Sequence, residues 1–209
     1  MARKTIQGPI RNKEKTKQKL LDTVGKIIRE EGYTALKVNY IAKTAGLDKK
    51  LIYDYFGNAD GLIHTYIKSQ DYWNNISTTL DFEITPKSLE IATKEMILQQ
   101  FEVLKNNKEL QKIILWELSE ENDVLRQLAD AREHNGEELF SKYIDSHFKN
   151  SDFNFRAILA LLISGSYYLN IHTETNGSKF CGIDLKTDEG RKEIEKAISK
   201  LIKWSFEKR

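Results

Sequence analysis

The sequence predicts an all-α protein, in which a small N-terminal helix-turn-helix domain precedes a larger helical domain, with about nine helices in total. The chain has 209 residues, which is enough for one small and one larger hydrophobic core. Proline occurs only at Pro9 and Pro86, so long stretches contain no helix breaker. Between the breaks, apolar residues recur three and four positions apart, which is the spacing of one face of a helix.

The charges are placed unevenly along the chain. Residues 1–55 carry 13 Lys and Arg against 6 Asp and Glu, a balance of +7, and the remaining residues carry 20 against 25, a balance of −5. A basic first quarter on an acidic body favours a DNA-binding module attached to a part that does not bind DNA. Residues 1–12 are predicted to be a basic N-terminal arm, because Gly8-Pro9 opposes a helix there. Such an arm either follows the minor groove or is simply solvated.

The helix-turn-helix domain is predicted for residues 13–58 and begins with a helix from about Lys13 to Glu31. We expect its apolar stripe to pack against the next two helices and to set their angle. The stripe consists of Leu20, Leu21, Val24, Ile27 and Ile28.

The next predicted helix is short and ends in a tight turn. Its inward face is formed by Val38, Ile41, Ala42 and Ala45. Gly46 supplies the positive φ that ends this helix and turns the chain. Asp48 is a good cap for the helix that follows, because its side chain accepts from free backbone N–H groups.

The second short helix is predicted to be the DNA-reading helix. Ile52 and Phe56 point inward, one turn apart. The outer face is left with Lys49, Lys50, Tyr53 and Asp54. Two lysines and a tyrosine on one exposed face suit a helix that lies in the major groove.

This stretch resembles the N-terminal domain of the TetR family of bacterial transcriptional regulators. The matching residues follow the family's order without a gap: Gly32-Tyr33, Ile41-Ala42, Ala45-Gly46-Leu47-Asp48 and Ile52-Tyr53-Asp54-Tyr55-Phe56. The resemblance covers roughly Lys15 to Leu62, and the rest of the chain agrees only in length and helical character. It implies a homodimer that binds a near-palindromic operator in double-stranded DNA, more often as a repressor, and is released by a small-molecule effector.

The expected DNA contacts fall into two groups of residues. Lys49, Lys50, Leu51 and Tyr53 are expected to face base edges and adjacent phosphates. The DNA backbone is expected to be positioned by Lys37, Tyr40 and Tyr55. For Tyr55, partial packing in the core is the competing interpretation.

Four positions depart from the family pattern. Lys37 and Leu51 stand where Thr or Ser is usual, Lys50 stands where a small residue is usual, and Ala59 replaces a lysine that binds phosphate. One interpretation is an atypical operator sequence. The other is a degenerate TetR-like protein without specific operator binding, which acts as a ligand-binding or protein-interaction module.

Residues 59–209 are predicted to form the helical effector-binding and dimerisation domain. Its first helix, from about residue 59 to 79, connects the head with the body. The following helices are expected at about 86–106, 110–118, 123–149, 155–173 and 187–209, with Gly136 interrupting the third of these. Residues 175–184 are expected to be a loop that contains glycine.

The homodimer contact is expected on the last two helices, about 155–173 and 187–209. The first of these is apolar on nearly every face, so one chain of this size cannot cover it alone. Ser164-Gly165-Ser166 provides a flat spot for close helix approach. A two-fold partner also supplies the second head that paired half-sites need.

The resemblance places an unknown small-molecule effector among the central helices. Large or amphipathic side chains are the candidate walls of that pocket: Phe101, Trp116, Phe140, Tyr143, Tyr168 and His172. Ordinary core packing is the competing interpretation for each of them.

No catalytic residue, metal site or cofactor is predicted. The four histidines lack the spacing of a three- or four-ligand metal site, and the chain has no Gly-rich phosphate loop, Gly-x-Ser-x-Gly or Cys-x-x-Cys motif. The longest wholly apolar run, residues 157–163, is far shorter than the ~20 residues that a membrane helix needs. With a single cysteine, Cys181, and no apolar leader, we expect a cytoplasmic protein that is not an enzyme.

Overall fold

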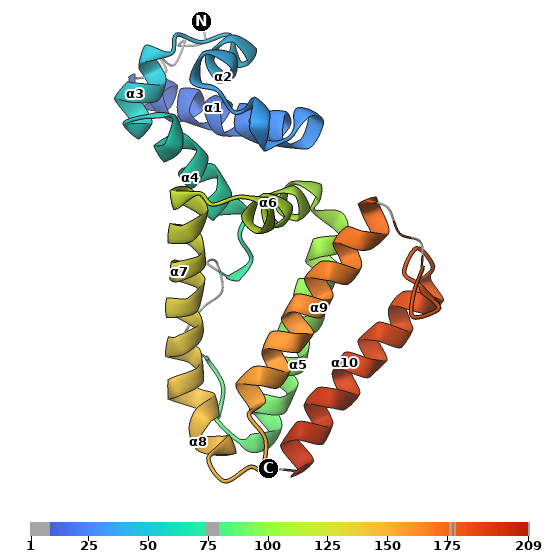
Figure 1. Cartoon of the computed structure of the whole chain (residues 1–209). Helices are drawn as coiled ribbons and strands as arrows, with labels where there is room; N and C mark the ends of the chain where they lie inside the picture. Colours follow the sequence, from blue (N-terminus) through green and yellow to red (C-terminus); the bar gives the residue numbers. More distant parts are fainter. Residues whose placement is uncertain (1–8, 74–79, 176, 178, 209) are drawn as a thin grey trace, which may run out of the picture.

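The computed structural model describes residues 9–73, 80–175, 177 and 179–208. Within these ranges the chain is helical apart from turns and one short hairpin, which confirms the all-α prediction. Figure 1 shows a small helical head at one end and a longer helical body below it.

The longest helix of the head is α1 (Pro9–Glu31). It begins at Pro9, whereas the prediction placed its start near Lys13, so the last residues of the expected arm belong to the helix. Proline suits a first helical position because the N–H that it lacks would have no partner there. Residues 1–8 of the expected arm lie outside the described residues.

The two predicted short helices follow as α2 (Val38–Ala45) and α3 (Lys50–Phe56), after a 3-10 turn, η1 (Tyr33–Ala35), that was not predicted. Gly46 has a φ of 61°, and its N–H donates to the carbonyls that end α2. Asp48 accepts from the backbone N–H of Lys50 at 2.8 Å, as the predicted cap requires. Ile41, Ala42, Ala45 and Ile52 are buried on the inner side of the pair.

The helix after the reading pair, α4 (Ala59–Gln70), is shorter than predicted. It ends at Gln70 because Asp71 takes an extended conformation and is buried against a body residue. Of the predicted continuation to residue 79, residues 74–79 lie outside the described part of the chain. The buried residues of α4 pack into the head core: Leu62, Ile63, Tyr66 and Ile67.

One glycine allows α4 to lie close to α1. A Cβ at Gly25 would collide with the hydroxyl group of Tyr66. Tyr66 is 7% exposed, so it has little room to move away.

Five helical segments and one π-helical turn build the body. They are α5 (Pro86–Asn106), α6 (Lys108–Ser119), α7 (Asp123–Leu139), the π-turn η3 (Phe140–Ile144), α8 (Asp145–Phe148) and α9 (Phe155–Thr175), before the last helix. The predicted start at Thr85-Pro86 is confirmed, since Thr85 and Ser88 form a reciprocal capping box. The irregularity of the long third helix lies in η3 and not at Gly136.

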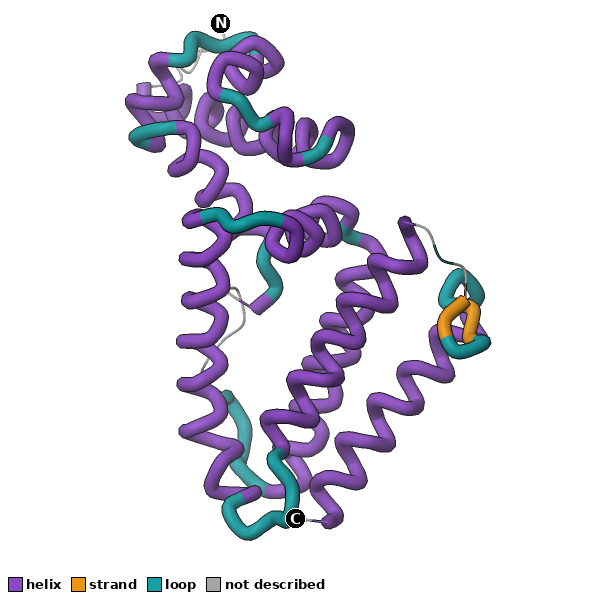
Figure 2. The backbone as a smooth tube through the Cα atoms, viewed as in Figure 1, coloured by secondary structure: helices purple, strands orange, loops and turns teal. Residues whose placement is uncertain are grey.

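A hairpin connects α9 to the last helix, α10 (Asp188–Lys208). Strands β1 (Lys179–Phe180) and β2 (Ile183–Asp184) pair antiparallel in a segment that was expected to be a loop. Figure 2 shows this hairpin beside the end of α9, and α5, α9 and α10 running side by side below it. Counting α7, η3 and α8 as one continuous helical stretch, the described residues form nine helices, as predicted.

The buried apolar residues gather mainly in two clusters. The head cluster extends into the body through Ile113 and Trp116 of α6 and Leu125 and Leu128 of α7. The body cluster lies between α5, α9 and α10, around the fully buried Phe101. The head is therefore packed directly onto α6 and α7.

Candidate DNA-reading face and body cavity

The outer face of α3 is open to solvent, and α3 lies in the head at the start of α4, which leads down to the body (Figure 1). Lys49, Lys50 and Asp54 are exposed there, and 49% of Tyr53 is open to solvent. Leu51 is half-buried, and Ile52 on the opposite side is fully buried. The structure therefore brings the four expected base-reading residues to one end of the head.

The three residues expected to position the DNA backbone lie around this helix. Lys37 is exposed immediately before α2 and its side chain gives α2 no cap, as expected for a lysine in place of Thr or Ser. Tyr55 is half-buried and packs against the head core. The ammonium group of Lys13 also lies over the ring of Tyr55, 5.4 Å from the ring centroid.

Tyr40 is tied to the end of α1. Its hydroxyl donates to Glu31 Oε1 at 2.7 Å, and 36% of the residue remains exposed. That hydrogen bond raises the pKa of Tyr40, and partial burial and the charge of Glu31 add to it.

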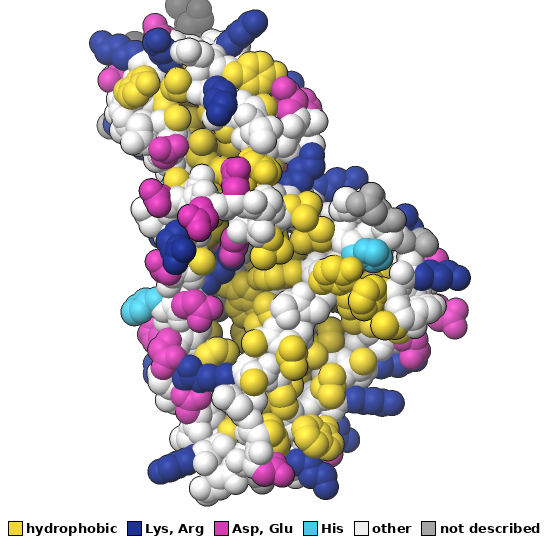
Figure 3. Space-filling model, in the orientation of Figure 1, with side chains coloured by type: hydrophobic (Ala, Val, Ile, Leu, Met, Phe, Trp, Pro, Cys, Tyr) yellow, Lys and Arg dark blue, Asp and Glu magenta, His cyan; other side chains and the backbone are white. Residues whose placement is uncertain are grey.

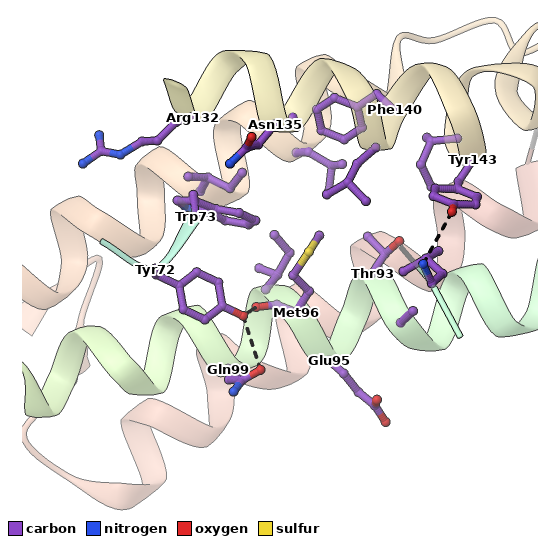
Figure 4. Close-up of a pocket in the computed structure, with 18 of the residues that line it drawn as sticks. Tyr72, Trp73, Thr93, Glu95, Met96, Gln99, Arg132, Asn135, Phe140 and Tyr143 are labelled. Atoms are coloured by element: carbon purple, nitrogen blue, oxygen red, sulfur yellow. Dashed lines mark hydrogen bonds between the residues drawn. The ribbon is translucent and has the colours of Figure 1, made fainter. Parts of the chain in front are cut away.

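The body contains a cavity of about 640 Å³ between α5, α7 and α9. Figure 4 shows Thr93 and Met96 of α5 pointing toward Asn135 of α7 and Phe140 of η3. The other walls are largely apolar or aromatic and include Trp73, Leu89, Ile97, Leu139, Ile144, Leu159 and Ile163. This volume is typical of sites for small organic ligands.

Residues 20–66 match the family model of bacterial regulatory proteins of the tetR family. This stretch comprises most of α1, the reading pair and most of α4. The N-terminal part of the chain is therefore similar to that of TetR-family regulators. A search of curated proteins gives no match.

Solved structures with the same fold cover most of this chain. A Clostridium perfringens protein assigned as a fatty acid metabolism regulator aligns at a TM-score of 0.62 and 17% identity, over 88% of this chain and 96% of its own. NalD, the secondary repressor of the MexAB-OprM multidrug efflux pump in Pseudomonas aeruginosa, aligns at 0.57 and 14%, over 93% and 96%. A TetR transcriptional regulator from Agrobacterium tumefaciens aligns at 0.55 and 16%, over 88% and 93%. At such identities the likeness extends to the fold alone.

The structure places two of the six predicted effector residues, Phe140 and Tyr143, in the walls of the cavity. Phe101 instead lies in the body core, beneath the guanidinium of Arg191 at 4.3 Å from its ring centroid. Trp116 stacks on Tyr33 at 4.8 Å and belongs to the contact between head and body.

The last two predicted effector residues lie on the outside of α9. Tyr168 and His172 stack on each other at 5.5 Å, and Phe180 of the hairpin meets both rings edge-on. None of these three rings lines the cavity. They are part of an exposed aromatic cluster.

Several walls of the cavity were not predicted. Tyr72 and Trp73 come from the segment assigned to the connecting helix, and Met96 and Thr93 come from α5. Trp73 donates its ring N–H to the Tyr167 hydroxyl at 2.9 Å, and Tyr72 donates to the Met96 carbonyl at 3.1 Å. The close spacing of Tyr66, Tyr72 and Trp73 in the sequence was the one hint of an aromatic cavity wall. The helical pattern alone does not show which of their faces borders a cavity.

An ion-pair cluster lies where the cavity meets the end of α4. Arg132 of α7 donates to Asp71 Oδ2 at 2.6 Å and to Glu117 Oε2 at 2.7 Å. Burial lowers the pKa of Arg132, but the bonds and charges of Asp71 and Glu117 outweigh it, so the net shift is upward. Arg132 and Glu117 also line the cavity. The cluster joins α4, α6 and α7.

A second apolar surface is exposed on α9 and α10. Leu161 and Tyr168 of α9 are 74% and 53% exposed, and Leu201 and Trp204 of α10 are 46% and 45% exposed. Figure 3 shows hydrophobic side chains gathered over this side of the body.

Two kinds of site are missing from the part of the chain that the structure describes. No group of three His, Cys, Asp or Glu residues there is arranged to hold a metal ion. In the same ranges, no helix has the length and hydropathy needed to span a bilayer.

Proposed function

We propose that this TetR-like chain is a homodimeric transcriptional repressor that binds a near-palindromic operator and is released by a small molecule in the body cavity. The observation that carries the proposal is the exposed outer face of α3, with Lys49, Lys50 and Tyr53 open to solvent. A short helix with a free basic face at the end of a compact head is suited to the major groove.

Pairing through α9 and α10 is supported by their exposed apolar side chains. Soluble monomers rarely expose several large hydrophobic residues on one continuous face. A second copy related by a two-fold axis would cover Leu161, Tyr168, Leu201 and Trp204. It would also add the second head needed for two half-sites.

Release by a ligand is supported by the position of the Arg132 cluster. Arg132 and Glu117 line the cavity, and Asp71 directly follows the last residue of α4. A ligand that moves Arg132 therefore moves the end of a helix that packs inside the head core. Couplings of this kind are typically worth ~1–3 kcal/mol. We propose that DNA binding represses transcription and does not activate it. One matched structure, NalD, is itself a repressor.

DNA binding is tested by fluorescence anisotropy with the DNA upstream of the protein's own gene, over a range of salt concentrations. Lys50→Ala should weaken binding to operator and random DNA alike, and lower the salt slope by about one. Leu51→Ala should change the sequence preference instead. Lys192→Ala, an exposed lysine of α10, is the control and should change neither. Absence of any sequence preference at every salt concentration would refute operator binding.

Dimerisation is tested by light scattering on purified protein. The wild type should have twice the chain mass of 24.3 kDa, and Leu161→Glu should be monomeric. Leu118→Glu is the matched control, because Leu118 is 77% exposed but belongs to α6 and not to α9 or α10. A monomeric wild type, or dissociation by Leu118→Glu alone, would contradict the proposed interface.

A second function is favoured by one observation on the reading face. Asp54 is exposed on α3 beside the two lysines, where a carboxylate repels phosphate unless it accepts from a cytosine amino group. A TetR-like protein that binds ligands or proteins without reading DNA fits this residue. The same anisotropy titration separates the two, and Asp54→Asn should strengthen binding to random DNA under the second function.

A further inference from the structure

The body cavity has an interior suited to an aromatic ligand. Trp73 and Phe140 line it at separate positions above α5, and Met96 points up toward them from α5 (Figure 4). Leu89 and Ile97, also from α5, are nearly or fully buried beneath it. A volume of about 640 Å³ accommodates several aromatic rings.

The charged residues around this interior are mostly acidic. Among the described lining residues, Asp81, Glu95, Glu117 and Glu133 are carboxylates and Arg132 is the one cation, which gives a balance of −3. Glu95 points away from the space between α5 and α7 (Figure 4). Without Glu95 the balance is still −2.

The guanidinium groups near the cavity are already neutralised. Arg132 binds two carboxylates, those of Asp71 and Glu117. Arg156 lies 5.0 Å from the centre of the Phe140 ring and binds Glu137 and Asp145, each at 2.5 Å.

One lysine also lies near the cavity. Lys142 contacts the ring of Tyr143 at 5.0 Å; it is exposed, as Asp81 and Glu133 are, but it is not among the residues that line the cavity. A carboxylate or phosphate ligand would therefore meet net negative charge and, among the described lining residues, find no unpaired cation to compensate its own desolvation.

We propose that the cavity binds a lipophilic cation, an aromatic molecule with one delocalised positive charge. The inference rests on the proposed effector role of the cavity and adds the chemical class of the effector. Aromatic faces such as those of Trp73 and Phe140 attract a cation, and the acidic surround adds a long-range attraction. Delocalised charge matters because such an ion loses less hydration energy on entering an apolar interior than a compact ammonium does.

A matched pair of ions tests the charge. Tetraphenylphosphonium and tetraphenylborate present the same four phenyl groups around opposite charges. Titration calorimetry on the full-length protein should show phosphonium binding at least about tenfold more tightly, which corresponds to about 1.4 kcal/mol. Equal binding, tighter binding of the borate, or no binding of either ion would overturn the proposal.

Substitutions locate the site. Met96→Trp fills the space between the aromatic walls and should abolish phosphonium binding. Glu133→Gln should weaken it about threefold, as expected for loss of one charge at a partly solvated rim. Asp130→Asn is the control, because Asp130 is an exposed acid of the same helix that does not line the cavity, and it should bind as the wild type does. Equal effects of the two acid substitutions would overturn the assignment to this cavity.

The binding titration contains no DNA, so its result is independent of operator recognition. Failure of the proposed regulatory function appears instead in the anisotropy assay, as absent operator binding or as binding that no cavity ligand reverses. A borate preference together with ligand-reversible operator binding would overturn the ligand class and leave the regulator standing.

Discussion

Replacement of Arg132 by methionine should strongly destabilise the protein. Asp71 is 2% exposed, and the Arg132 side chain, itself 12% exposed, holds it at 2.5 Å. Removing Arg132 takes away the guanidinium that pairs with the buried Asp71 carboxylate, and loss of one partner of a buried ion pair typically costs about 3–5 kcal/mol. For a chain of this length, that loss lowers the melting temperature by roughly 6–20 °C.

The matched control is Arg156→Met. Arg156 also holds two carboxylates at 2.5 Å, but the side chains of Glu137 and Asp145 are 63% and 43% exposed. Water replaces the lost partner there, so the cost should be about 1 kcal/mol or less.

Urea denaturation of the two variants against the wild type measures both losses. The double variant Asp71→Asn/Arg132→Met should recover much of the Arg132→Met loss, because the most deeply buried charge is gone and the remaining carboxylate, Glu117, is 25% exposed. Equal losses for Arg132→Met and Arg156→Met would refute the argument from burial.

Three further predictions concern the head. Burial, followed by the charge of Glu109, raises the pKa of Tyr66 to about 12, so the folded state keeps this proton more tightly than the unfolded state does. The resulting stability, about 2 kcal/mol, is complete below pH ~10 and is lost as the pH rises to about 12; Tyr66→Phe should remove this loss in alkaline urea titrations, and an unchanged pH slope would disprove it. Gly25→Ala should cost about 1–3 kcal/mol by pushing against the Tyr66 ring, whereas Gly136→Ala, whose added methyl meets Phe140 at an ordinary 3.7 Å, should be neutral or stabilising; the melting temperatures decide the order. Asp48→Ala should cost about 1 kcal/mol by removing the cap of α3, measured by urea denaturation, and a loss near zero would mean that α3 does not depend on that bond.

The reading pair was predictable because its signals are local. Gly46 sets the turn, Asp48 caps the next helix, and the spacing of Ile41, Ala45 and Ile52 fixes the buried side within about a dozen residues. Each of these interactions joins residues that are neighbours in the sequence. The prediction therefore reached the level of single hydrogen bonds.

The end of α4 and the cavity depend on contacts between distant residues. Asp71 terminates its helix at a bond with Arg132, which lies 61 positions further along the chain. Trp116 was expected in a pocket, but Tyr33 lies across its ring, 83 positions earlier. The pattern of apolar and aromatic residues predicts that a side chain is buried, but it does not predict whether protein or a ligand buries it.

The chain contains three tryptophans, and each lies in a different region of the molecule. Trp73 lines the cavity, Trp116 stacks at the joint between head and body, and Trp204 is exposed on α10. Three variants that each retain one indole would therefore give separate fluorescent reporters of the proposed ligand entry, of movement between head and body, and of the proposed subunit pairing. A stopped-flow experiment with these reporters would establish the order in which the three events occur, without any attached dye.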